Sequence, residues 1–233
     1  MEETIKERVE AVLERIARAA SRSGRSPESV RLVAVSKTQP VERIAEAYEA
    51  GLTVFGENYV QEAEEKIRVF PEAEWHFIGK LQGNKVKKAV SLFGWIQTVD
   101  SNRALSEISR RCEEAGKTMP VLIEVNLGGE ESKGGVSPVE LPFLLASAAG
   151  LPGIHVRGLM AIPPLTDDPG ESRPRFVRLR ELRDRYASNC GMEGERMELS
   201  MGMSNDFEAA IEEGATMVRI GTAIFGIRSR RER

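Results

Sequence analysis

The sequence has few cysteines and histidines, which argues against a metal centre and against a scaffold stabilised by disulfides. It contains two cysteines and two histidines in 233 residues. Cys112 and Cys190 lie far apart in the chain, and two reduced thiols in a cytosolic protein are a simpler interpretation than a disulfide between them. We therefore expect neither a disulfide framework nor a metal cofactor.

Long apolar runs and a strong excess of one charge are also absent. No apolar run approaches the roughly 20 residues that span a bilayer, and the formal net charge is only −3. The charged, amphipathic start, residues 1–6, resembles neither a signal peptide nor a transit peptide. We expect a cytoplasmic protein that binds neither nucleic acid nor membranes.

The sequence instead alternates short β-rich runs with longer helical patterns, many of them separated by glycine or proline. Strands are predicted at 30–36, 53–55, 75–78, 95–99, 121–126, 155–161, 196–201 and 217–220. Helices are predicted between them at 41–50, 57–69, 83–92, 102–115, 138–149, 171–188 and 205–213. An additional amphipathic helix at 4–23 precedes the first strand and ends at Gly24.

This alternation predicts an α/β fold whose parallel strands are joined by right-handed crossovers. Eight units without a break in composition favour a closed (β/α)8 TIM barrel over an open doubly wound sheet, with residues 1–233 as a single domain. Few residues follow the last predicted strand. We therefore expect the additional N-terminal helix to cover the place of an eighth outer helix.

Function in such a barrel is expected at the carboxyl ends of the strands, and the first predicted strand leads directly into Lys37. Two interpretations fit this position. The lysine either marks the strand end and extends its amine to solvent, or it is a nucleophile. A low-dielectric surrounding would disfavour its ammonium form and favour attack on an aldehyde.

The last two strands end in a cluster of small and hydroxylated residues. Ser200, Gly202 and Ser204 follow one strand, and Gly221 and Thr222 follow the next. Barrels often bind phosphate with these two loops and the start of a short helix. Because the first and eighth strands are neighbours in a closed barrel, a phosphate-bearing aldehyde fits both this cluster and the lysine. An ordinary helix start, capped by Asn205 with Glu208 three residues on, is compatible with the same segment.

Other strand ends offer candidates with two interpretations each. Arg219 lies within the last strand and needs a partner, either a pyridine nitrogen or a carboxylate. The amide of Asn58 is placed to touch a ring substituent, while Glu57 before it suits the first turn of a helix. Met160 packs either on a planar ring or in the core. Lys133 is a second candidate amine.

The histidine and two further lysines near the third strand have plainer interpretations. His76 is expected to point into the packing, and Lys80 and Lys85 are expected to be solvated. Gly79 would let a flat ligand approach the backbone.

Several of these segments together resemble one known family. The matching motifs are LVAVSKT at 32–38, FGEN at 55–58, HFIG at 76–79 with LQ and NK after it, LSMGMS at 199–204, and VRIGT at 218–222 with IFG after it. They look like the YggS/PROSC family of pyridoxal phosphate homeostasis proteins. The resemblance covers nearly the whole chain, in order.

This resemblance implies a barrel like the alanine racemase N-terminal domain, which is fold type III among proteins that use pyridoxal 5′-phosphate (PLP). It implies that Lys37 forms the Schiff base and that Arg219 faces the pyridine nitrogen. Ser200, Ser204, Gly221 and Thr222 fall in the phosphate-binding segments, with either serine as the closer contact. The whole implied cofactor-binding set is Lys37, Asn58, Ile78, Met160, Ser200, Met201, Ser204, Arg219, Gly221 and Thr222.

The resemblance also implies a carrier or regulator of PLP in vitamin B6 homeostasis. We further expect apo PLP-dependent enzymes as partners and a monomer or weak dimer as the state of the chain. The alternative is an amino-acid racemase of fold type III. Of the three tyrosines only Tyr59 is predicted near the active face, and an arginine at the pyridine nitrogen would weaken PLP as an electron sink. A barrel enzyme acting on a sugar phosphate is a third hypothesis.

Overall fold

Eight parallel strands close into a barrel in the computed structural model, which describes residues 3–128, 134–164, 168–187 and 197–226. Each strand pairs with the next along the chain, and β1 pairs with β8 to complete the ring. The strands are β1 (Arg31–Val35), β2 (Val54–Glu57), β3 (Glu74–Phe77), β4 (Trp95–Val99), β5 (Met119–Glu124), β6 (Ile154–Met160), β7 (Glu198–Ser200) and β8 (Met217–Ile220). The predicted (β/α)8 TIM barrel is thereby confirmed.

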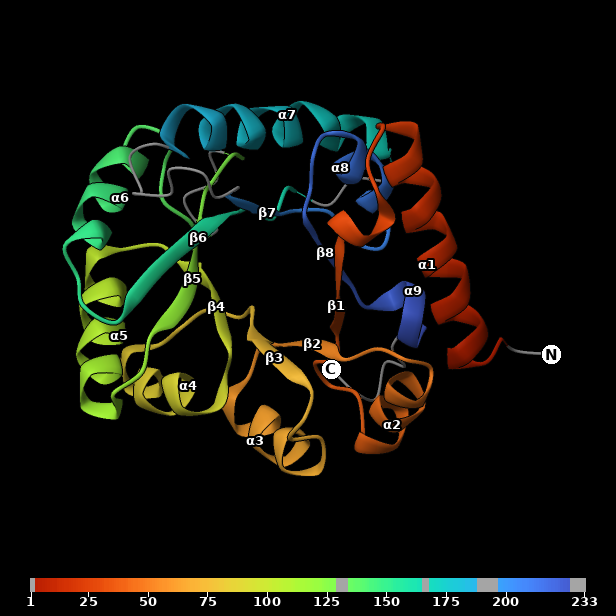
Figure 1. The fold of residues 1–233 in the computed structure, drawn as a ribbon, viewed down its shortest axis with the longest axis horizontal. Helices are drawn as coiled ribbons and strands as arrows, with labels where there is room; N and C mark the ends of the chain where they lie inside the picture. The colour runs from red at the N-terminus through yellow and green to blue at the C-terminus, as the bar shows by residue number, and fades with distance from the viewer. Residues whose placement is uncertain (1–2, 129–133, 165–167, 188–196, 227–233) are drawn as a thin grey trace.

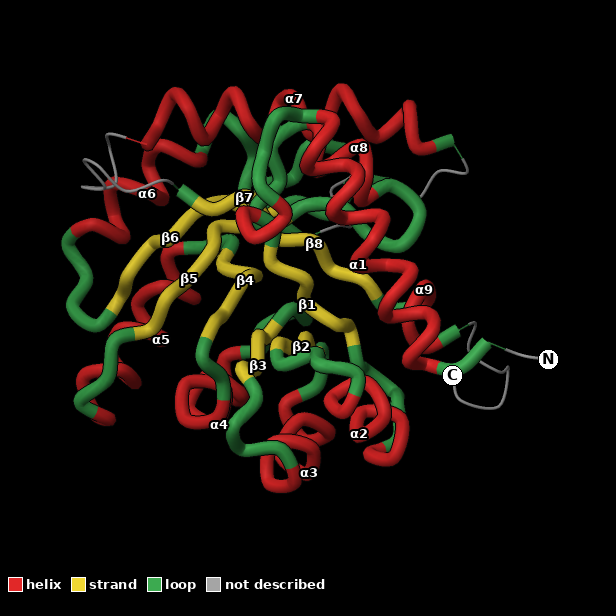
Figure 2. The backbone as a smooth tube through the Cα atoms, turned by 45° about the vertical axis from the view of Figure 1, so that its right-hand side comes forward, coloured by secondary structure: helices red, strands yellow, loops and turns green. Residues whose placement is uncertain are grey.

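Helices follow the strands and form an outer layer around the barrel (Figures 1 and 2). They are α1 (Ile5–Arg22), α2 (Val41–Glu49), α3 (Val60–Val69), α4 (Val86–Leu92), α5 (Asn102–Ala115), α6 (Leu141–Ala149), α7 (Pro169–Tyr186), α8 (Phe207–Glu212) and α9 (Thr222–Phe225). Helix α5 shows the usual signals, since Ser101 caps its start and Gly116 ends it in the left-handed conformation. None of the described helices has the length and apolarity needed to cross a membrane.

The N-terminal helix α1 occupies the place where a full eighth helix would lie. Thr4 and Glu7 form a capping box at its start, and one apolar stripe along it is buried. In the described residues that follow β8, up to residue 226, the chain forms the single-turn α9, and α1 packs beside α9, α8 and α2 (Figure 1). The expectation that the additional helix covers this gap is confirmed.

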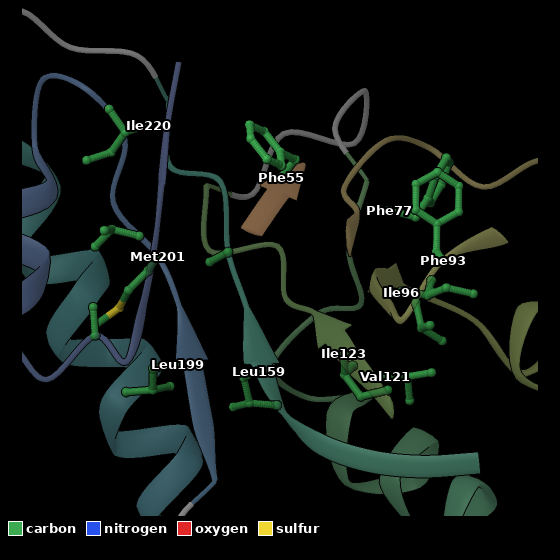
Figure 3. Close-up of a cluster of buried hydrophobic side chains, with 14 of the residues drawn as sticks. Phe55, Phe77, Phe93, Ile96, Val121, Ile123, Leu159, Leu199, Met201 and Ile220 are labelled. Carbon is green, nitrogen blue, oxygen red and sulfur yellow. The ribbon is translucent and has the colours of Figure 1, made fainter. Parts of the chain in front are cut away.

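The hydrophobic core lies between the strands and the helices, whereas the barrel interior is partly polar. Figure 3 shows outward-facing side chains of this core, among them Leu159, Leu199 and Ile220. Inside the barrel, a separate small apolar cluster consists of Leu122, Met160 and Met217, with Trp95 packed against it. The barrel interior also holds the buried polar side chains of His76, Gln97, Ser200 and Arg219.

Two local predictions were wrong. Glu57 does not begin a helix: it ends β2, and α3 starts three residues later at Val60. At this strand end Glu57 Oε1 accepts from the buried Ser36 hydroxyl and from the Lys66 ammonium. Asn205 is not the cap of α8; the cap residue is Asp206, without a side-chain cap bond, and Glu208 pairs with Arg15 of α1 instead.

Candidate functional site

The turn that carries Lys37 is held by buried charged residues behind it. Lys37 lies two residues beyond the end of β1 and is half-buried. The Ser36 hydroxyl donates to Glu57 Oε1 at 2.7 Å, and the Ser36 carbonyl accepts from Lys66 Nζ at 2.7 Å. Glu62 Oε1 accepts the backbone N–H of Thr38 at 2.5 Å. Both neighbours of Lys37 are therefore fixed from the side of α3.

Lys66 is the cation of this arrangement, which we call the α3 network (Ser36, Glu57, Glu62 and Lys66). Its side chain is 4% exposed and lies 2.7 Å from Glu57 Oε1, and it also pairs with Glu62. Burial raises the pKa of the Glu57 carboxyl, and the nearby Lys66 ammonium partly opposes this rise. Of these four residues only Glu57 was considered from the sequence, as part of a helix start, and Glu62 and Lys66 were not predicted. The i,i+4 spacing of Glu62 and Lys66 is visible in the sequence, but their contact with β1 and β2 is not.

The predicted phosphate-binding residues gather beside β1. Gly221 packs so closely on Val35 that an added Cβ would lie 3.3 Å from the Val35 carbonyl oxygen. Thr222 begins α9, and the Ser204 hydroxyl accepts the backbone N–H of Ala223 at 3.2 Å. Since Val35 stands two residues before Lys37, the loops after β7 and β8 adjoin the lysine turn.

Arg219 lies inside the barrel, almost fully buried at 4% exposure. Its Nη1 donates to the Ser200 hydroxyl at 2.5 Å and its Nη2 to the Ala161 carbonyl at 2.9 Å. Neither of these partners is a carboxylate, and Glu124 and Asp206 act on Arg219 through space. Burial lowers the pKa of the Arg219 guanidinium to about 10, so it stays charged at neutral pH.

The two serines of the predicted set face different surroundings. Ser200 is fully buried inside the barrel, where its hydroxyl meets Arg219 and also donates to Gln97 Oε1 at 2.6 Å. Ser204 lies instead at the start of α9, beside Gly221 and Thr222. Met160 is buried in the interior apolar cluster, and Met201 packs outside the barrel in the core of Figure 3.

A cavity of about 220 Å³ opens at the barrel mouth on the side of β2 to β5. Asn58 and Ile78 line it with Gly79, and Asn58 Oδ1 is buried without a hydrogen-bond partner among the described residues. Gly79 has no room for a side chain, because an added Cβ would lie 2.3 Å from the Asn58 carbonyl oxygen. Because buried acceptors are rarely left without a partner, Asn58 Oδ1 is a candidate contact for a ligand in this cavity.

Glu124, which ends β5, lines the same cavity and was not predicted as a site residue. Burial, with Asp100 as the next cause, raises the pKa of its carboxyl to about 7. Arg219 and Lys80 oppose the rise. A carboxyl that titrates near neutral pH at the mouth of a barrel is a functional candidate. Its position at a strand end is visible in the sequence, but its burial is not.

The remaining candidates fall in several places. His76 is fully buried, as expected, but it is hydrogen-bonded rather than simply packed: Nε2 lies 2.5 Å from Glu74 Oε1. Lys80 is exposed and lines the mouth cavity, and Lys85 lines a neighbouring one. Lys133 lies outside the described residues.

Comparison with known proteins gives a full-length match. The family model described as alanine racemase, N-terminal domain, matches residues 8–229. A pyridoxal phosphate homeostasis protein from Aquifex aeolicus is 48% identical, over 95% of this chain and 97% of its own length. The protein of the same name from Escherichia coli K12 is 45% identical, over 93% of this chain and 94% of its own length.

Solved structures agree with this match. PipY from Synechococcus elongatus, whose structure has PLP bound, is 39% identical with a TM-score of 0.80, covering 91% of this chain and all of its own. The alanine racemase from Corynebacterium glutamicum shares the fold at 18% identity and a TM-score of 0.69. That likeness covers 94% of this chain and 62% of the racemase.

Proposed function

Because this chain belongs to the YggS/PROSC family of pyridoxal phosphate homeostasis proteins, built on the alanine racemase N-terminal domain, we propose that it binds PLP through Lys37 and serves as an intracellular carrier or regulator of PLP. One observation carries this proposal: three features lie together at one end of the barrel. The loops with Ser204, Gly221 and Thr222 pack against Val35, next to the turn that carries Lys37. The third feature is the buried Arg219, which has no paired carboxylate among the described residues.

The residues present fit the chemical groups of PLP. A phosphate needs several donors, and the hydroxyls of Ser204 and Thr222 with the backbone beside Gly221 supply them. A pyridine nitrogen needs a donor, and Arg219 has only donors to offer. The unpartnered Asn58 Oδ1 and the flat approach at Gly79 suit a ring with polar substituents.

We assign each residue a role on this basis. Lys37 would hold PLP through its amine, which can add to an aldehyde. Ser204, rather than Ser200, contacts the phosphate together with Gly221 and Thr222, since the Ser200 hydroxyl is engaged with Arg219 and Gln97. Asn58 and Ile78 border the ring, Ser200 and Met160 support the site from inside the barrel, and Met201 supports the end of β7 from the outer core.

A carrier is favoured over a turnover enzyme. An arginine that stays charged and donates to the ring nitrogen prevents protonation of that nitrogen, which PLP enzymes use to stabilise carbanions. The relatives are named homeostasis proteins. We further propose that residues 1–233 form one PLP-binding domain, that the protein works in the cytoplasm as a monomer or weak dimer, and that apo PLP-dependent enzymes receive its PLP.

Absorption spectroscopy tests the proposal directly. Purified protein mixed with PLP should turn yellow, and Lys37→Ala should abolish the visible band while Lys80→Ala, a lysine at the same barrel mouth, keeps it. A colourless wild-type protein, or an unchanged band in Lys37→Ala, would refute the proposed site.

Two assays separate a carrier from an enzyme. Loaded protein should restore activity to an apo PLP-dependent enzyme, and Lys37→Ala should not. Turnover of an amino acid at rates near the enzyme range of roughly 1–10³ per second would overturn the carrier assignment.

A further inference from the structure

A line of buried hydrogen bonds crosses the barrel interior from Arg219 to the opposite end of the barrel. Ser200 donates to Gln97 Oε1 at 2.6 Å, and Gln97 Nε2 lies 2.6 Å from His76 Nδ1. His76 Nε2 lies 2.5 Å from Glu74 Oε1. We call Glu74, His76, Gln97 and Ser200 the interior relay; its outer end is half-exposed, where Arg31 pairs with Glu74 at 3.0 Å.

The relay runs through the interior and not along the barrel wall. Gln97 lies on β4 and Ser200 on β7, with β5 and β6 between them in the ring. Their side chains can meet only across the centre of the barrel. His76, Gln97 and Ser200 are each fully buried, so every polar atom among them depends on its protein partners.

The order of donors in the relay is set from the Glu74 end. A carboxylate only accepts, so the proton of a neutral His76 must sit on Nε2, and Nδ1 must be an acceptor. Gln97 therefore turns its amide nitrogen to His76 and its oxygen to Ser200, and the second N–H of that nitrogen points at the Met217 sulfur at 3.8 Å. The Ser200 proton then points to Gln97, which leaves the oxygen lone pairs of Ser200 facing Arg219.

Two electrostatic effects are consistent with this order. Burial lowers the pKa of the His76 imidazole, which favours the neutral ring. The hydrogen bond from His76 lowers the pKa of the Glu74 carboxyl, which favours the acceptor form.

We propose that Glu74, His76 and Gln97 are positioning residues that orient the Ser200 hydroxyl and thereby hold the Arg219 guanidinium where the proposed function puts the pyridine nitrogen of PLP. The effect on PLP binding rests on the proposed function, whereas the order of donors and acceptors in the interior relay does not. None of the three residues touches PLP. They act by giving Arg219 a single oriented acceptor on one side, so that its remaining donors stay directed at the ring.

Nitrogen NMR of the PLP-free protein tests the donor order. The chain has two histidines, so His155→Asn leaves His76 as the one imidazole signal. We expect a neutral ring with the proton on Nε2. In Gln97→Glu the new carboxylate accepts from both Ser200 and Nδ1, so His76 should become doubly protonated. A wild-type ring with its proton on Nδ1, or one unaffected by Gln97→Glu, would overturn the donor order.

PLP titration tests the consequence. Gln97→Met keeps the side-chain length but removes both polar contacts, and we expect roughly tenfold weaker PLP binding with a displaced visible band. Gln97→Glu keeps the acceptor for Ser200 and should retain near-wild-type affinity. Leu122→Met, a change of similar volume in the same interior, is the control and should alter neither reading.

A double-variant cycle guards against a general packing effect. Ser200→Ala alone should weaken PLP binding about as much as Gln97→Met, and the double variant should be no worse than either, because both break the same line of bonds. Additive losses, or a Gln97→Met protein indistinguishable from Leu122→Met, would refute the relay. If the wild-type chain bound no PLP, the proposed function would fail, while the NMR measurement would still decide the donor order.

Discussion

The raised pKa of Glu124 at the barrel mouth has a measurable effect on stability. A rise from 4.5 in the unfolded chain to about 7 in the folded one corresponds to about 3 kcal/mol, since each pKa unit is worth about 1.4 kcal/mol. The folded state prefers the protonated carboxyl. Its contribution is therefore fully present below pH 4.5 and is lost as the pH rises through about 7.

Glu124→Gln keeps the shape and removes the titration. We expect the variant to match the wild type in unfolding free energy at about pH 4 and to exceed it by about 3 kcal/mol above about pH 8. Urea unfolding at a series of pH values measures the difference. Glu10→Gln, a change at an exposed carboxyl of α1, is the control. A Glu124→Gln difference that stays constant across this pH range would refute the assignment of a buried, raised carboxyl.

Three further expectations concern stability. Lys66→Met leaves Glu57 and Glu62 without their cation and should cost about 3–5 kcal/mol in urea unfolding; a loss below about 1 kcal/mol would show that the pair is not buried as described. Gly79→Ala should destabilise by at least about 1–3 kcal/mol because of the overlap with the Asn58 carbonyl, whereas Gly150→Ala, which has open space around it, should not. Arg25→Met loses hydrogen bonds to the Ser29, Ile211 and Ala215 carbonyls and should cost about 1–3 kcal/mol; an unchanged thermal midpoint would contradict these contacts.

Local sequence patterns predicted the elements of this fold well, because each strand and helix is encoded by its own spacing of apolar residues. The strands 95–99 and 217–220 match β4 and β8. The boundaries that failed depend on distant partners. In β2, Gly56 packs against the side chains of Ile78 and Val33, which leave no room for a side chain at this position. The next residue, Glu57, pairs with the buried Lys66. Neither contact can be predicted from residues 53–58 alone.

The site residues also fall into those that the sequence predicts and those that depend on distant partners. Lys37, Ser204 and Gly221 are predicted from the rule that function gathers at the carboxyl ends of barrel strands. The residues that orient Ser200 beside Arg219 were harder to predict: Gln97 was not predicted, and His76 was expected only to point into the packing, because both lie within strands. Their importance depends on which strands face each other across the ring, and this becomes clear only when the barrel is closed.

The seam where the barrel closes joins the beginning of the chain to its end, since β1 pairs with β8 and α1 packs on α8 and α9. During synthesis at roughly 5–20 residues per second, the apolar stripe of α1 emerges from the ribosome long before α8 and α9, although α2 follows it closely. The nascent chain must therefore keep that stripe from other proteins until the final strand is released.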